Sequence, residues 1–118
     1  RILLVEDDSG IRDSVTECLV IEGYAVSAVA NGAEALAWLA REAPPDLVVL
    51  DLSMPVMSGR DLLDHLRADP RLRGVPAVLM TAAMPGRTPV PSAEAVLSKP
   101  FDLDDLLDTV ARLARPRD

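Results

Sequence analysis

Polar residues with reactive side chains follow short apolar runs at four places in this sequence. They are Glu6, Asp7 and Asp8 after residues 2–5, Asp51 after residues 47–50, Thr81 after residues 77–80, and Lys99 shortly after residues 95–97. Crowded carboxylates repel each other unless a cation lies among them, and oxygen ligands favour a hard divalent ion such as Mg²⁺. An aspartate can also attack phosphorus to form an aspartyl phosphate, while hydroxyl and ammonium groups bind phosphoryl oxygens. These residue types therefore predict a phosphoacceptor site.

The apolar runs themselves predict strands, and helical periodicity appears between them. Strands are expected over residues 2–5, 25–30, 47–50, 77–80 and 95–97, and the apolar stripes of helices fall within residues 11–21, 33–40, 62–66 and 103–113. Strands that alternate with helices predict a doubly wound α/β domain, with a parallel sheet covered by helices on both faces. Ligands of such sheets bind beyond the carboxyl ends of the strands, so the candidate residues are expected to converge there.

The composition indicates one acidic globular domain. The chain has 118 residues, 49% of them hydrophobic, a formal net charge of −7 and a single lysine, Lys99. This length suits one core, and the negative charge with few aromatic residues argues against nucleic acid as a direct partner. Cys18 is alone and cannot form an internal disulfide, and no apolar stretch reaches the roughly 18 residues of a membrane span. We expect a cytoplasmic domain that contacts neither nucleic acid nor membrane.

Four motif segments occur in order along essentially the whole chain: Val5-Glu6-Asp7-Asp8, residues 51–59 (Asp-Leu-Ser-Met-Pro-Val-Met-Ser-Gly), Met80-Thr81-Ala82 and Lys99-Pro100-Phe101. In these motifs the chain resembles a bacterial response-regulator receiver domain of two-component signalling. The resemblance implies a flavodoxin-like fold with five parallel strands in the order 2-1-3-4-5. It also implies a signalling phosphoacceptor rather than an enzyme.

The resemblance assigns a role to each candidate residue at the acidic edge. Asp51 would accept a phosphoryl group from a histidine of a sensor kinase or of a histidine phosphotransfer protein. Asp7, Asp51 and the backbone carbonyl of Ser53 would bind Mg²⁺, and Glu6 would act through a metal-bound water.

The remaining site residues are implied by the same resemblance. Thr81 and Lys99 would bind the phosphoryl oxygens, and Ala82 would leave room beside them. The Lys99–Pro100 peptide bond would be cis, as receivers usually have it.

The resemblance also implies how the domain is bounded and what it meets. Residues 1–114 would form the receiver, and residues 115–118 the start of a linker or tail. The start at Arg1 and this tail favour a chain that is part of a longer protein. A downstream effector or a second copy of the chain is expected as an output partner, beside the kinase.

Two departures from the receiver pattern concern the output of the signal. Lys99 lies 18 positions after Thr81, and the residues between them include Pro85, Pro89 and Pro91, so this interval is shorter than in most receivers by about one helical turn. We predict that the fourth helix of the family is missing or irregular here. Val96 stands where receivers usually have a Tyr or Phe. An alternative is therefore an atypical receiver whose altered region 82–95 serves mainly for protein interaction or dimerisation.

Two other classes of protein share parts of this pattern. A phosphatase of the haloacid-dehalogenase type also forms an aspartyl phosphate, but it needs a second aspartate two residues after the nucleophile, where this chain has Ser53. A flavodoxin-like cofactor carrier needs a Gly- and hydroxyl-rich phosphate loop after the first strand. The acids at that place would repel a flavin phosphate.

Several polar or reactive residues are better interpreted as structural. His65 is expected on the surface or partly buried, and Trp38 and Cys18 are expected to pack in helices. Asp102 is the expected N-cap of the last helix, and the acids that follow it would favour the helix dipole: Asp104, Asp105 and Asp108.

Overall fold

A computed structural model of the protein describes residues 1–51, 59–81, 95–98 and 102–114. In chain order its elements are β1 (Ile2–Val5), α1 (Ser9–Ile21), β2 (Val26–Val29), α2 (Gly32–Arg41), β3 (Leu47–Asp51), α3 (Gly59–Ala68), β4 (Ala77–Thr81), β5 (Ala95–Ser98) and α4 (Leu103–Leu113).

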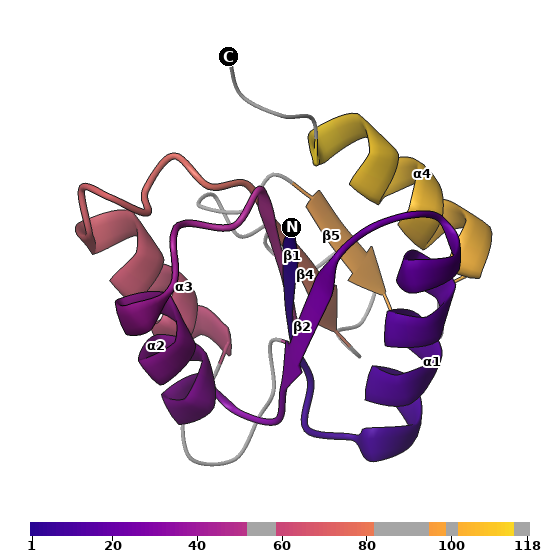
Figure 1. Ribbon diagram of the computed structural model, residues 1–118, viewed down its shortest axis with the longest axis horizontal. Helices are drawn as coiled ribbons and strands as arrows, with labels where there is room; N and C mark the ends of the chain where they lie inside the picture. The colour runs from indigo at the N-terminus through magenta and orange to yellow at the C-terminus, as the bar shows by residue number, and fades with distance from the viewer. Residues whose placement is uncertain (52–58, 82–94, 99–101, 115–118) are drawn as a thin grey trace.

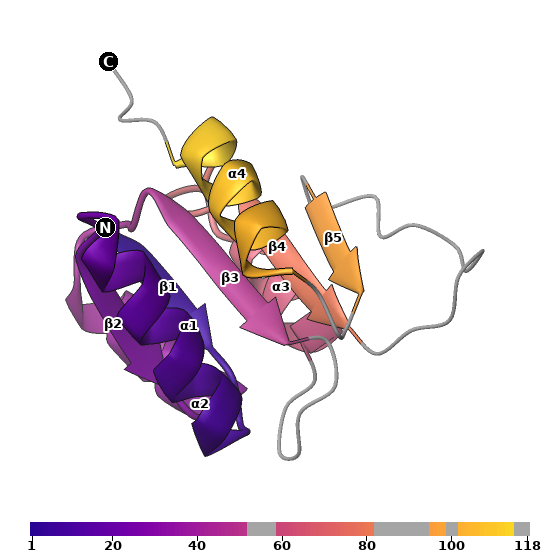
Figure 2. The ribbon, with the colours of Figure 1, turned by 90° about the vertical axis from the view of Figure 1, so that its right-hand side faces the viewer.

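The five strands form one parallel sheet in the order β2-β1-β3-β4-β5 (Figures 1 and 2). Helices α1 and α4 cover one face of the sheet, and α2 and α3 cover the other (Figure 1). This arrangement confirms the predicted doubly wound fold. Because all strands run the same way, their carboxyl ends share one edge, which is the lower edge in Figure 1.

The strands are buried on both faces, as expected for a parallel sheet between two helical layers. Leu3, Val5 and Leu50 pack toward α2 and α3, while Leu4 and Val49 pack toward α1 and α4. Adjacent residues along one strand therefore contribute to two separate cores. Trp38 lies in the first of these cores, which confirms its expected packing role.

The helix ends follow local sequence signals. Asn31 is the N-cap of α2, and its side chain accepts a hydrogen bond from the Glu34 amide at 2.9 Å. Gly23 adopts a φ of 99° just after α1, a conformation that glycine takes without steric penalty. Asp102 occupies the predicted N-cap position of α4, but its side chain makes no capping hydrogen bond.

The output region is only partly covered by the described residues. We predicted that the family's fourth helix is missing or irregular, and this prediction concerns residues 82–94, which lie outside the described residues. The helix labelled α4 is a different one: it is the helix predicted last in the chain, over residues 103–113. Val96 is described, and it is 42% exposed on β5. None of the described helices has the length and apolar character needed to cross a membrane.

Candidate functional site

Three carboxylates meet at the carboxyl edge of the sheet. Glu6 and Asp7 follow β1, and Asp51 ends the neighbouring strand β3. Val5 pairs with Leu50 in the parallel register, so the next residues of the two strands, Glu6 and Asp51, leave the sheet at the same level. Oxygens of Glu6, Asp7 and Asp51 lie within 4.8 Å of one another. The sequence prediction that these acids converge is therefore confirmed.

The three carboxylates differ in their access to solvent. Glu6 is 0% exposed and Asp51 is 5% exposed, whereas Asp7 is exposed. The cluster thus has two buried members and one member at the surface. A solute can approach it from the side of Asp7.

Glu6 is held by its backbone and its side chain together. Its amide donates to the carbonyl of Val29 at 3.1 Å, and its Oε2 accepts from the Asp8 amide, also at 3.1 Å. Its carbonyl accepts from Nη1 of Arg12 at 2.9 Å. These bonds fix the turn from β1 into α1, on which Asp7 stands.

Asp8 has a different role from the two acids before it. Its Oδ1 accepts a hydrogen bond from the Ile11 amide at 3.0 Å, which makes it the N-cap of α1. The residue pattern placed all three acids at this edge, and the family resemblance assigned metal roles to Glu6 and Asp7 but no role to Asp8. The signal was available in principle, because a helix of 13 residues begins at the next position, Ser9.

The other predicted site residues are only partly within the described chain. Thr81 is the last residue of β4. The residue before it, Met80, pairs with Asp51, so the backbone of Thr81 lies at the same edge of the sheet as the acids. Ser53, Ala82, Lys99 and the predicted cis bond from Lys99 to Pro100 lie outside the described residues.

This arrangement supports two kinds of chemistry. Carboxylate oxygens without nitrogen or sulfur ligands suit a hard divalent cation, and a cation would offset the mutual repulsion of the three acids. An aspartate at the end of a strand is also a potential nucleophile toward a phosphoryl group.

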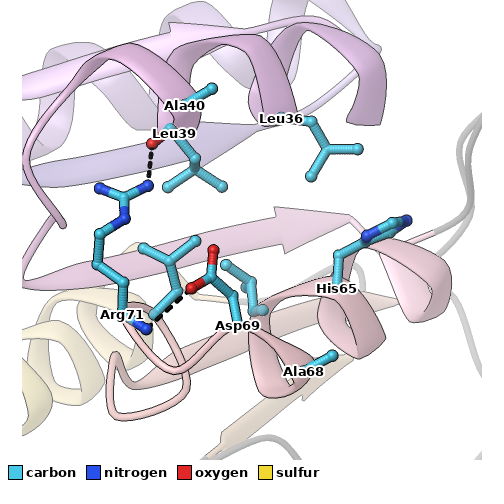
Figure 3. A pocket seen from close by; sticks show the side chains of 9 residues that line it. Leu36, Leu39, Ala40, His65, Ala68, Asp69 and Arg71 are labelled. Atoms are coloured by element: carbon cyan, nitrogen blue, oxygen red, sulfur yellow. Dashed lines mark hydrogen bonds between the residues drawn. The ribbon is translucent and has the colours of Figure 1, made fainter.

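The chain also has a pocket between α2 and α3, away from the acids. Its volume is about 280 Å³, and Leu36, Leu39, Ala40, His65, Leu66, Ala68, Asp69, Arg71 and Leu72 line it (Figure 3). Arg71 bridges its two sides, because the guanidinium donates to the carbonyl of Leu39 while the Arg71 amide donates to Asp69 Oδ1 at 2.8 Å. His65 is exposed, in agreement with the expectation that it lies on the surface or is partly buried. The side chains that line this pocket come from α2, from α3 and from the segment that follows α3.

The family of the chain follows from comparison with known proteins. The response regulator receiver domain matches residues 2–111, so the chain belongs to this family. It is 39% identical to the DNA-binding response regulator MtrA of Mycobacterium tuberculosis, over 100% of this chain and 52% of MtrA. It is 34% identical to the DNA-binding dual master transcriptional regulator RpaA of Synechocystis sp., over 100% of this chain and 50% of RpaA. The chain thus spans about half the length of these curated relatives.

Solved receiver structures share the fold. The response regulator TrrA of Thermotoga maritima, solved in complex with Mg²⁺ and BeF, superposes with a TM-score of 0.85 at 33% identity, covering 96% of this chain and 97% of that one. The chemotaxis response regulator CheY4 of Vibrio cholerae also gives a TM-score of 0.85, at 30% identity, covering 95% of this chain and 96% of that one. The chain is thus a receiver domain of the response regulators of two-component signalling.

Proposed function

We propose that this receiver domain accepts a phosphoryl group on Asp51 and that the modification controls its interaction with an output partner. The observation that supports this most directly is the cluster of Glu6, Asp7 and Asp51 oxygens within 4.8 Å at the carboxyl edge of the sheet. Asp51 is the only one of the three that stands within a strand, where its backbone is fixed by the sheet. A nucleophile needs such fixed placement.

Magnesium fits this set of donors. Mg²⁺ usually takes one or two protein carboxylates and completes its shell with water and phosphate oxygens. We propose that Asp7, Asp51 and the Ser53 carbonyl hold the ion, and that Glu6 contacts it through water. When bound, the ion supplies positive charge that neutralises the phosphoryl oxygens.

In the proposed reaction, phosphorus moves from a histidine nitrogen to an aspartate oxygen. An Asp51 carboxylate oxygen bonds to phosphorus while the bond from phosphorus to the imidazole nitrogen breaks, and the electron pair stays on that nitrogen. The Thr81 hydroxyl would donate to one phosphoryl oxygen, and the Lys99 ammonium would offset the charge on another. The domain would act as a signalling phosphoacceptor and would at most assist its own phosphorylation and the slow loss of the phosphoryl group.

The partners follow from this function. A sensor histidine kinase or a histidine phosphotransfer protein would supply the phosphoryl group. We propose residues 1–114 as the receiver unit, which is consistent with α4 ending at Leu113 and with the Ala114 amide donating to the Val110 carbonyl at 2.8 Å. MtrA and RpaA are DNA-binding regulators. By analogy, we propose that this receiver controls DNA binding by another domain or by a partner protein.

Intact-mass analysis with a small phosphodonor tests the proposal. The domain is incubated with phosphoramidate with and without Mg²⁺, beside the variant Asp51→Asn. We expect one phosphoryl adduct on the wild type that depends on Mg²⁺ and is lost in the variant. An equal adduct on Asp51→Asn would refute the assignment of the acceptor.

Turnover separates the phosphoacceptor from the phosphatase alternative. A phosphoacceptor is modified once per molecule and does not sustain hydrolysis of a phosphomonoester. Steady release of phosphate from such a substrate would favour the haloacid-dehalogenase type, in spite of Ser53 at the position of its second aspartate.

A second candidate is a receiver that binds partners without switching. Val96, exposed at 42% on β5, carries no aromatic ring that could turn inward after phosphorylation. Size-exclusion chromatography with light scattering, before and after phosphorylation, distinguishes the two candidates. A change of oligomeric state with phosphorylation would favour the switching receiver, while unchanged assembly and partner affinity would favour the interaction module.

A further inference from the structure

Arg12 lies on the first turns of α1 and reaches back over the turn that precedes this helix. Its Nη1 donates to the carbonyl of Glu6 at 2.9 Å in a partly buried contact. Its own amide donates to the Asp8 carbonyl, also at 2.9 Å. One residue of α1 is therefore bonded to the backbone on both sides of Asp7.

The turn held in this way carries two of the three clustered acids. Glu6 Oε2 accepts a hydrogen bond from the Asp8 amide at 3.1 Å. The position of the Glu6 side chain therefore depends on the position of the Asp8 backbone. Arg12 fixes the carbonyl of Glu6 in the same turn. Movement of that carbonyl would displace Glu6 and Asp7 relative to Asp51, which the sheet holds separately.

The charge of Arg12 is directed at a carbonyl. Within the described part of the chain, no salt bridge joins Arg12 to a carboxylate. A guanidinium that paired with Asp7 or Asp51 would compete with a metal ion for the same oxygens. Bonded to the Glu6 carbonyl, it can hold the turn without competing with a metal ion for the carboxylate oxygens.

From these contacts we propose that Arg12 is a positioning residue for the cation site, and that it fixes Glu6 and Asp7 in the geometry that binds Mg²⁺. The inference rests on the proposed function and extends it to a residue outside the ligand set. Arg12 touches neither the ion nor the phosphoryl group in this role. It acts through the backbone of Glu6.

Removing Arg12 has two opposite effects on the affinity for Mg²⁺. Loss of its positive charge beside the acids would by itself strengthen the binding of a cation. Loss of the hydrogen bond would loosen the turn and weaken binding. The sign of the change therefore shows which effect dominates.

Calorimetric titration with MgCl₂ at constant ionic strength measures this sign on the wild type, Arg12→Ala, Arg12→Lys and Arg73→Ala. Arg73 is exposed beyond α3, so its variant removes the same formal charge from another part of the chain. We expect Arg12→Ala to bind Mg²⁺ about fivefold more weakly than the wild type, which is the scale of one hydrogen bond. Arg12→Lys keeps the charge and places an ammonium donor group on a long stem, so it should recover most of the affinity. Arg73→Ala should match the wild type.

Amide hydrogen exchange gives a second readout that needs no metal. In Arg12→Ala without Mg²⁺, the Asp8 amide should exchange faster, because its acceptor Glu6 is no longer held by Arg12. Arg12→Lys should restore protection, which keeps the test decisive if the alanine variant is poorly folded. Mg²⁺ binding by Arg12→Ala as tight as or tighter than that of the wild type, with unchanged exchange at Asp8, would overturn the inference. A wild type that forms no phosphoryl adduct would instead overturn the proposed function.

Discussion

At the scale of residues, three consecutive acids have three different environments. Glu6 is buried and bonded to the backbone of Asp8, Asp7 is exposed in the cluster, and Asp8 caps α1. The difference arises from the turn, which directs each side chain to a different neighbour. Substitutions at these positions should therefore affect different properties of the domain.

Asp8→Ala should lower stability and leave the cation site intact. Without the Asp8 carboxylate, the Ile11 amide at the start of α1 loses its acceptor, which typically costs about 1 kcal/mol. The bond from the Asp8 amide to Glu6 does not involve the side chain and should persist. Urea unfolding followed by circular dichroism measures the first effect, and Mg²⁺ titration the second.

Asp8→Ser is the matched control for this prediction. Serine is also a good N-cap, so the variant should recover most of the stability lost in Asp8→Ala. A large loss of Mg²⁺ affinity in the serine variant would show that Asp8 is a ligand of the ion, contrary to its assignment as a cap.

At the scale of elements, arginines hold the connection between α3 and β4. Nη1 of Arg67 donates to the carbonyls of Arg73 and Val75, each at 2.8 Å. The guanidinium of Arg71 donates to the carbonyls of Leu39 and, at 3.1 Å, Glu42. The last carbonyls of α2 have no partners within their own helix, so Arg71 satisfies two acceptors at that helix end.

Arg71→Ala should destabilise the domain by about 1 kcal/mol, because an exposed guanidinium bonded to two carbonyls is partly replaced by water. Thermal unfolding measures this loss. Arg73→Ala on the same connection serves as the control and should lie within about 0.5 kcal/mol of the wild type. Equal stability of the two variants would show that the contact of Arg71 with α2 contributes nothing measurable.

The sequence predicted the fold and the three acids of the cluster because both depend on periodic patterns. Short apolar runs between helical stripes indicate a parallel sheet, and parallel strands bring their carboxyl ends to one edge. From these two rules we predicted that Asp51 lies near Glu6 and Asp7, although more than forty positions separate it from them in the sequence.

The contacts of single long side chains could not be predicted in this way. Arg12 and Arg71 reach backbone carbonyls, and a carbonyl is present at every residue, so sequence spacing does not reveal which one accepts. The division between Asp7 and Asp8 likewise depends on where α1 begins, and helix boundaries are the least regular part of a periodic pattern.

At the scale of the whole molecule, electrostatics opposes the folded state. The chain has 19 acidic and 12 basic side chains, and folding brings one oxygen from each of three carboxylates within 4.8 Å of the other two. Two of them are buried, where screening by salt is weak. The metal-free domain is therefore expected to carry a local repulsion that binding of a cation relieves.

Mg²⁺ should consequently raise the stability of the domain as a whole. A ligand that binds only the folded state adds about 1.4 kcal/mol when its free concentration is ten times its Kd. Asp7→Asn should lose most of this gain, because one ligand is weakened. The same variant should be at least as stable as the wild type in EDTA, because one of the three repelling charges is gone. Urea unfolding of the wild type and of Asp7→Asn, each in MgCl₂ and in EDTA, measures the four free energies of unfolding.

Sodium chloride at matched ionic strength separates binding from screening. Screening acts on the whole net charge, which is −7 in the wild type and one unit smaller in magnitude in Asp7→Asn, so NaCl should stabilise the variant nearly as much as the wild type. Binding acts only at the cluster, so the additional gain in MgCl₂ should be confined to the wild type. If NaCl reproduces the full effect of MgCl₂ in both proteins, the three acids form no cation site, and the repulsion among them is a cost of the fold that general screening alone reduces.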